Sequence, residues 1–171
     1  YLLQVLMHAG RIPTVPIYLD SPMAVDATEI FREFHEDHDL SEGRLHGSES
    51  VLAGPNVHMV RSVQDSKNLN AINGPAVIIS SSGMMTGGRI LFHLKRRLPH
   101  NENTVLLGGY MAPGTLGRHL QEGRSFVRIH KRDIDVRAHI DSVSGLSGHA
   151  GQSELLQWVS VLPAPQITFL T

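Results

Sequence analysis

Apolar residues along this chain recur in two patterns, and each pattern predicts a different element. Short apolar runs bounded by Gly, Pro or polar residues predict buried strands, and apolar stripes at helical spacing predict helices between them. Because strands and helices alternate over short connections, we expect an α/β fold with a mainly parallel sheet flanked by helices. The strands are expected at residues 15–19, 57–60, 76–80 and 104–108, and the helices at residues 2–9, 22–38, 63–72, 88–98 and 115–121.

The pattern changes after Gly123, where apolar and polar residues begin to alternate. Residues 126–130 and 134–143 alternate with a period of two, which predicts an antiparallel pair of strands. The remaining expected elements are a loop or irregular hairpin at residues 39–55, a helix at residues 153–161 and a strand at residues 166–170.

Composition limits the classes of function. The chain has 171 residues, 41% of them hydrophobic and 18% charged, which suits one packed domain. The 15 Lys and Arg against 16 Asp and Glu give a formal net charge of -1, which argues against nucleic-acid binding through bulk charge. Any phosphate contact must therefore be local. Cys is absent, which excludes disulfides and thiolate zinc sites and fits a reducing compartment, so we expect a cytoplasmic protein.

The two ends of the chain carry a further expectation. No apolar run approaches the roughly 18 residues that span a bilayer, and residues 1–9 lack the basic flank and cleavage site of a signal peptide. The chain opens without Met on an apolar helical pattern and closes on the β-type run ITFLT. We expect both ends to be cuts through a larger protein, with no membrane partner.

Residues able to contact an anion follow three of the predicted strands, at the edge where open α/β sheets bind their ligands. Asp20 and Ser21 follow the first strand, where they also suit a simple helix N-cap, which is the interpretation that the residues alone favour. A run of hydroxyls and glycines follows the third strand and offers O–H and backbone N–H donors at a helix start. A tight turn without function explains that run as well, because it lacks the Lys of a P-loop. Its candidate residues are Ser80, Ser81, Ser82, Gly83 and, at its end, Arg89.

Two later motifs carry candidate chemistry. Residues 108–118, GGYMAPGTLGR, follow an apolar strand; their glycines allow close approach to a ligand, and Arg118 could pair with a phosphate. A Gly-rich loop with a solvated Arg is the plainer interpretation. Residues 143–150, VSGLSGHA, place His149 near a helix start, where a histidine can donate a proton near neutral pH. A lone histidine is usually structural, and the other histidines show no zinc-site spacing.

Four motifs, in their order and spacing, resemble the β-CASP family of metallo-β-lactamase-fold nucleases. They are YLDSPMAVDAT, VIISSSGMMTGGRILFHLKRRL, NTVLLGGYMAPGTLGRHLQEG and GLSGHA. The resemblance is to the bacterial and archaeal members related to the endonuclease subunit of the pre-mRNA cleavage and polyadenylation machinery, with ribonuclease J more distant. It implies a β-CASP domain over residues 1–146 and, over residues 147–171, a return segment into a metallo-β-lactamase αββα fold.

The same resemblance implies a zinc-dependent ribonuclease. In that family single-stranded nucleic acid lies in a cleft, two zinc ions generate the attacking hydroxide, and the histidine matching His149 protonates the leaving 3′ oxygen. The family's zinc ligands fall outside the span of this chain, so we expect the chain alone to hold no catalytic zinc and to be inactive. The family commonly carries an Asp where this chain has Gly151. The implied phosphate or sugar contacts are Ser80 to Gly83, Ser147 and Gly148; Arg89 and Arg118 become backbone clamps or structural ion pairs, and Met84 and Tyr110 base contacts.

The expected partners are single-stranded RNA, the metallo-β-lactamase domain of the same polypeptide and, by family analogy, a second copy in a homodimer. Two alternatives stay open. A nuclease-dead β-CASP scaffold would lack the family's H-x-H-x-D-H metal motif, and a stand-alone doubly wound nucleotide-binding domain would bind a mononucleotide tightly. The presence of His149 favours the nuclease over both.

Overall fold

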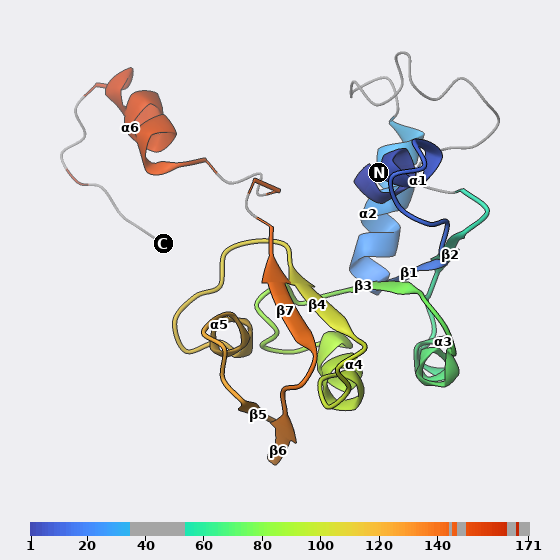
Figure 1. Ribbon diagram of the computed structural model, residues 1–171. Coiled ribbons are helices and arrows are strands. Elements are labelled where there is room, and N and C mark those ends of the chain that lie inside the picture. Colours follow the sequence, from blue (N-terminus) through green and yellow to red (C-terminus); the bar gives the residue numbers. More distant parts are fainter. Residues whose placement is uncertain (35–53, 144, 147–149, 164–166, 168–171) are drawn as a thin grey trace.

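The computed structural model describes residues 1–34, 54–143, 145–146, 150–163 and 167 (Figure 1). Each element predicted before residue 123 is present, although the predicted helix 22–38 runs beyond the described residues. The strands are β1 (Ile17–Asp20), β2 (Val57–Met59), β3 (Val77–Ser80), β4 (Thr104–Leu107), β5 (Phe126–Ile129), β6 (Arg132–Asp135) and β7 (His139–Ser142). The helices are α1 (Leu2–His8), α2 (Pro22–Glu33), α3 (Val63–Asn68), the 3-10 helix η2 (Leu69–Ala71), α4 (Ile90–Arg97), α5 (Leu116–Gln121) and α6 (Gln152–Ser160).

Parallel pairing dominates the sheets of the described residues. β2, β1 and β3 form a three-stranded parallel sheet in that order, with Ile17 opposite Val57 on one side and Val77 on the other. β4 and β7 form a second parallel pair, and β5 and β6 form an antiparallel hairpin. Figure 1 shows α1 and α2 on one side of the three-stranded sheet and α3 on the other. The predicted α/β fold with a mainly parallel sheet is confirmed.

The strand predicted at residues 134–143 is divided into two. β6 ends at Asp135, and the amides of Arg137 and Ala138 donate to the carbonyl of Leu98 at 2.8 and 2.9 Å. This contact with the end of α4 turns the chain, so that β7 joins β4 in parallel instead of prolonging the hairpin. The antiparallel prediction is therefore right for β5 and β6 and wrong for β7, because a tertiary contact ends β6.

The main hydrophobic core lies in the second half of the chain. Leu98, Leu107 and Leu120, at the end of α4, in β4 and in α5, are each at most 1% exposed. Fully burying a Leu side chain contributes about 1.5–3 kcal/mol, so these residues hold the three elements together. The other members of the core are Met85, Leu94, Met111, Val127, Ile129 and Ala138.

Helix α4 joins this core to the three-stranded sheet. Leu94 packs in the core, whereas His93, one position earlier, is buried against β1. Arg97 donates to the carbonyl of Leu69 on η2 at 2.8 Å. Helix α4 therefore contacts the core through Leu94, β1 through His93 and η2 through Arg97.

Side chains cap the starts of α2, α3 and α5 and satisfy backbone amides there. Ser21 caps α2 by accepting from the amide of Ala24 at 3.4 Å, with Pro22 in the first helical position. Thr115 caps α5 by accepting from the amide of Arg118 at 3.2 Å. The N-cap interpretation of Ser21 is confirmed.

The last described element is α6, and every residue of α6 is exposed, including Leu156 and Trp158. None of the helices in the described ranges is long and apolar enough to cross a membrane. The strand predicted at residues 166–170 and nearly all of the loop predicted at residues 39–55 lie outside the described residues.

Candidate nucleic-acid interface

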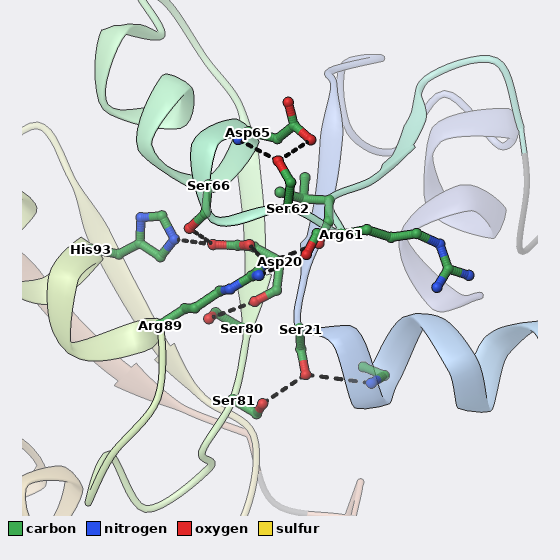
Figure 2. Close-up of polar contacts among 12 residues, drawn as sticks. Asp20, Ser21, Arg61, Ser62, Asp65, Ser66, Ser80, Ser81, Arg89 and His93 are labelled. Atoms are coloured by element: carbon green, nitrogen blue, oxygen red, sulfur yellow. Dashed lines mark hydrogen bonds and ion pairs between the residues drawn. The ribbon is translucent and has the colours of Figure 1, made fainter.

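Three distant elements meet at the carboxylate of Asp20, the last residue of β1. Its Oδ2 accepts hydrogen bonds from Ser66 Oγ on α3 and from His93 Nε2 on α4, both at 2.6 Å. Its Oδ1 accepts from the guanidinium of Arg89 at 2.7 Å (Figure 2). The Asp20 side chain is completely buried, so this carboxylate contacts protein groups only.

The contacts of Asp20 set its charge. Burial alone raises the pKa of Asp20, because water no longer solvates the anion. The hydrogen bonds from Ser66, His93 and Arg89 together outweigh burial, and the pKa of Asp20 lies below its usual range. Asp20 is therefore an anion at neutral pH, balanced by the Arg89 cation.

The guanidinium of Arg89 also donates hydrogen bonds to the protein backbone. Its guanidinium donates to the carbonyls of Val60 and Arg61 at 3.0 and 2.7 Å, in addition to Asp20. Of the two roles implied for Arg89, a clamp on nucleic acid or a structural ion pair, the structure contains the ion pair. Arg89 thus fixes the end of β2 to the start of α4.

The loop between β3 and α4, residues 81–89, is anchored by its serines. Ser80 Oγ donates to the carbonyl of Asp20 at 2.9 Å, and the hydroxyls of Ser81 and Ser21 are hydrogen-bonded at 2.7 Å. Ser82 Oγ accepts from the amide of Thr86 at 3.1 Å, inside the loop. The hydroxyls of Ser80, Ser81 and Ser82 therefore each already have a partner within the protein.

The backbone of this loop offers donors in their place. Gly83 and Met84 are exposed, and within the described part of the chain their amides donate no hydrogen bond. Two successive backbone N–H groups without an acceptor can bind an anion. Gly88 closes the loop with a φ of +80°, where a Cβ would lie 2.5 Å from the carbonyl oxygen of Ser81. Only glycine allows this close approach of the two ends.

The loop after β4 lies against the loop after β3. The amide of Gly117 donates to the carbonyl of Met84 at 3.2 Å, which brings two of the predicted ligand-contacting segments together. Met84 is 37% exposed and Tyr110 is 70% exposed. Arg118, by contrast, pairs with Glu122 at 2.9 Å on the surface of α5. The joined loops therefore present an exposed thioether, an exposed phenol ring and two backbone amides.

Two family models match the chain. The first, described as the Beta-Casp domain, matches residues 1–120. The chain belongs to the β-CASP family. A second model, described as the Zn-dependent metallo-hydrolase RNA specificity domain, matches residues 133–171 of this β-CASP chain. The family resemblance drawn from the four motifs is confirmed.

Curated relatives show what the β-CASP family includes. Ribonuclease TTHA0252 from Thermus thermophilus is 38% identical over 160 residues, which are 91% of this chain and 36% of the relative. Transcription termination factor FttA from Thermococcus kodakarensis is 32% identical over 176 residues, 96% of this chain and 27% of the relative. An RNase J-like protein from Methanocaldococcus jannaschii is 27% identical over 165 residues, 94% of this chain and 36% of the relative. The chain thus spans between 27% and 36% of the length of these relatives, in a family of nucleic-acid-processing hydrolases.

The histidine motif of this β-CASP chain falls on residues outside the described ones: Ser147, Gly148 and His149. Their predicted roles stay predictions. The chain approaches the motif from β7, where the amide of Val143 donates to the carbonyl of Leu107 at 2.9 Å. Because β7 and β4 are parallel, the chain leaves β7 at the same sheet edge as it leaves β4.

The departure from the family pattern at Gly151 falls on the N-cap residue of α6. The amide of Gly151 donates to the Glu154 carboxylate at 2.6 Å. Glycine has no side chain that could accept from the first amides of the helix, so the cap contact that an Asp would offer is absent.

The described residues do not fit the zinc ions that the β-CASP family implies. They contain no group of three or more His, Cys, Asp or Glu side chains that could hold a metal ion. The buried pair of Asp20 and His93 lies beside the Arg89 cation, which opposes a second positive charge at that carboxylate. We assign no step to zinc within this part of the chain.

His93 and Ser66 are partners of Asp20 that the sequence patterns did not predict. Residues four apart share one side of a helix, so the spacing between Arg89 and His93 was an available signal. Ser66 carried no such signal, because its partner lies 46 positions away in the sequence.

Proposed function

We propose that this chain is the RNA-binding part of a zinc-dependent β-CASP ribonuclease that hydrolyses phosphodiester bonds, and that it supplies the catalytic histidine, His149. One observation carries the RNA-binding proposal. The loops after β3 and β4 are joined at Met84. Together they present the exposed residues Gly83 and Met84, whose amides donate no hydrogen bond within the described residues, and the exposed Tyr110.

This surface suits single-stranded RNA of any sequence. Backbone N–H groups attract phosphate oxygens whatever the base, and an exposed aromatic ring stacks on any base. The net charge of -1 favours a local contact of this kind over a broad basic surface. Phosphate contact is accordingly assigned to the amides of Gly83 and Met84, and a base contact to Tyr110.

The catalytic proposal rests on His149 and on family membership. His149 is proposed to act as the general acid: as the bond between phosphorus and the 3′ oxygen breaks, His149 donates its proton to that oxygen. The zinc ligands are assigned to the metallo-β-lactamase part of the same polypeptide. A homodimer and a cytoplasmic location remain predictions from the sequence.

The test of RNA binding compares two exposed aromatic residues. Tyr110→Ala is expected to weaken the binding of a fluorescently labelled single-stranded RNA by roughly 5- to 150-fold, the loss of one stacking contact of about 1–3 kcal/mol. The matched control is Phe126→Ala on β5, which removes a ring that is 58% exposed and lies outside the joined loops. Fluorescence anisotropy measures both dissociation constants.

Two outcomes would contradict the proposal. Equal RNA affinity of the two variants would remove Tyr110 from the interface. Tight binding of a mononucleotide, with no gain from a longer RNA, would favour the doubly wound nucleotide-binding domain instead.

A further inference from the structure

The Gly-rich loop that follows β3 is held at both ends by a single residue, Asp20. At the entry, Ser80 Oγ donates to the Asp20 backbone carbonyl at 2.9 Å. At the exit, Arg89 and His93 donate to the two oxygens of the Asp20 carboxylate at 2.7 and 2.6 Å. Figure 2 shows Ser80, Arg89 and His93 converging on Asp20 from the two ends of this loop.

The same carboxylate is fixed from outside the loop. Ser66 on α3 donates to Asp20 Oδ2 at 2.6 Å, and Arg89 reaches the carbonyls of Val60 and Arg61. Asp20 is also followed by Ser21, whose hydroxyl is bonded to that of Ser81 at 2.7 Å. The position of the loop relative to β1, β2 and α3 is therefore set by polar contacts that centre on the buried Asp20 carboxylate.

Asp20 cannot contact RNA itself, because its side chain has no exposed surface and its two oxygens are occupied. We infer that Asp20 is a positioning residue for RNA binding: it holds the ends of the loop so that the amides of Gly83 and Met84 are arranged for a phosphate before RNA arrives. This inference rests on the proposed function. If the loop amides are already arranged before binding, less conformational entropy is lost when RNA binds. Asp20 is therefore expected to increase the affinity for RNA.

Two substitutions of His93 can separate the loss of its hydrogen-bond donor from a change in side-chain size. His93 contributes one donor, Nε2, to Asp20 Oδ2. His93→Gln places an amide N–H group near the same point, whereas His93→Leu removes the donor and keeps a side chain of similar bulk. The first variant is the conservative one, and the second leaves the carboxylate short of a partner.

The experiment uses the 171-residue chain and has two readouts. Hydrogen exchange measured by NMR reports the opening of the loop amides of Ser82, Met85 and Thr86, all of which are hydrogen-bonded within the loop. Titration with a single-stranded hexauridylate reports affinity and, through the amide signals of Gly83 and Met84, the place of binding. The variants are Asp20→Asn, His93→Leu and His93→Gln. The control is Ile129→Ala on β5, which lowers stability from the core and leaves residues 81–89 and the Asp20 contacts unchanged in sequence.

We expect Asp20→Asn and His93→Leu to weaken RNA binding by about tenfold or more, because the loop after β3 is less ordered before RNA binds. Both variants are also expected to speed hydrogen exchange of the loop amides. His93→Gln is expected to restore both quantities most of the way towards wild type. Ile129→Ala should lower the midpoint of thermal unfolding without changing either quantity at a temperature where it is folded.

Unchanged loop exchange in His93→Leu, or a change no larger than in Ile129→Ala at equal stability, would overturn the positioning role. If Asp20→Asn does not fold, the two His93 variants still decide the question. A wild-type chain that binds no RNA would refute the proposed function and the affinity part of this inference. The exchange measurement, made without RNA, would still show separately whether the Asp20 contacts order the loop.

Discussion

Among single residues, Asp20 makes the stability of the fold depend on pH. Its pKa in the folded protein lies below the usual range, so the folded state holds fewer protons there than the unfolded chain does at acidic pH. The resulting stabilisation is fully present above the unfolded pKa of about 3.9, and it is lost as the pH falls through the lower folded value.

We therefore expect Asp20→Asn to lower the free energy of unfolding by about 3 kcal/mol at pH 7, because Arg89 loses its buried counter-ion. The difference from wild type is expected to shrink between about pH 5 and pH 2. Urea unfolding of both proteins at a series of pH values measures this difference in the free energy of unfolding. The other carboxylates are the same in both proteins, so their contributions cancel. A difference independent of pH would show that the Asp20 charge is not linked to folding.

Two neighbouring glycines of the loop after β3 test its geometry at the same scale. Gly88→Ala is expected to destabilise the protein by about 1–3 kcal/mol, because a left-handed backbone and the Ser81 carbonyl leave no room for a Cβ. Gly87→Ala is the matched control, since a Cβ there meets nothing within 4 Å. Thermal unfolding compares the two, and equal losses would contradict the tight closure at Gly88.

At the scale of elements, the hairpin between β5 and β6 turns through two residues that are unfavourable for its geometry. His130 and Lys131 have φ values of 49° and 64°, the arrangement in which Asn and Gly are preferred. Lys131→Gly is expected to raise the free energy of unfolding by roughly 0.5–1 kcal/mol by removing the side-chain conflict. Lys131→Ala loses the same charge but keeps a Cβ, so its free energy of unfolding is not expected to rise. Denaturant unfolding that ranks the two variants equally would argue against a left-handed Lys131.

The elements that the sequence predicts well are those with a local cause. β1, β3 and β4 coincide with apolar runs, and Ser21 and Thr115 cap the helices that follow them. β7 was assigned the wrong partner because its place depends on the carbonyl of Leu98, some 40 residues earlier and at the end of α4. Periodicity describes a strand but carries no information on such a contact.

The candidate site divides in the same way. A ligand-contacting loop is predicted here because hydroxyls and glycines between a strand and a helix form a local pattern with both O–H and backbone N–H donors. In the fold, the hydroxyls of Ser80, Ser81 and Ser82 bond within the protein, whereas the amides of Gly83 and Met84 donate no hydrogen bond within the described residues. Which donors of the loop have no partner within the protein depends on residues of other elements. The sequence pattern of the loop carries no information on those residues.

At the scale of the whole molecule, the chain alone is expected to fold without holding catalytic zinc and without cleaving RNA. A two-metal site needs several ligands converging on ions about 3.5–4 Å apart, and the described residues contain no such group. The test incubates the chain, and a His149→Ala chain as control, with zinc and a labelled single-stranded RNA.

Cleavage that the His149→Ala control loses would place the metal ligands within this chain, and zinc-independent cleavage would overturn the proposed hydrolysis. In a protein that also carries the metal-binding part, His149→Ala is expected to lower turnover by about 10²–10⁴-fold with little change in RNA affinity.

The hydrogen bond between Asp20 and His93 can form only late in the synthesis of the chain. The two residues are 73 positions apart, and a ribosome adds about 5–20 residues per second, so Asp20 is made roughly 4–15 s before its partner. Until Arg89 and α4 have left the exit tunnel, Asp20 has neither Arg89 nor His93 as a partner, so the loop after β3 lacks these contacts in the nascent chain.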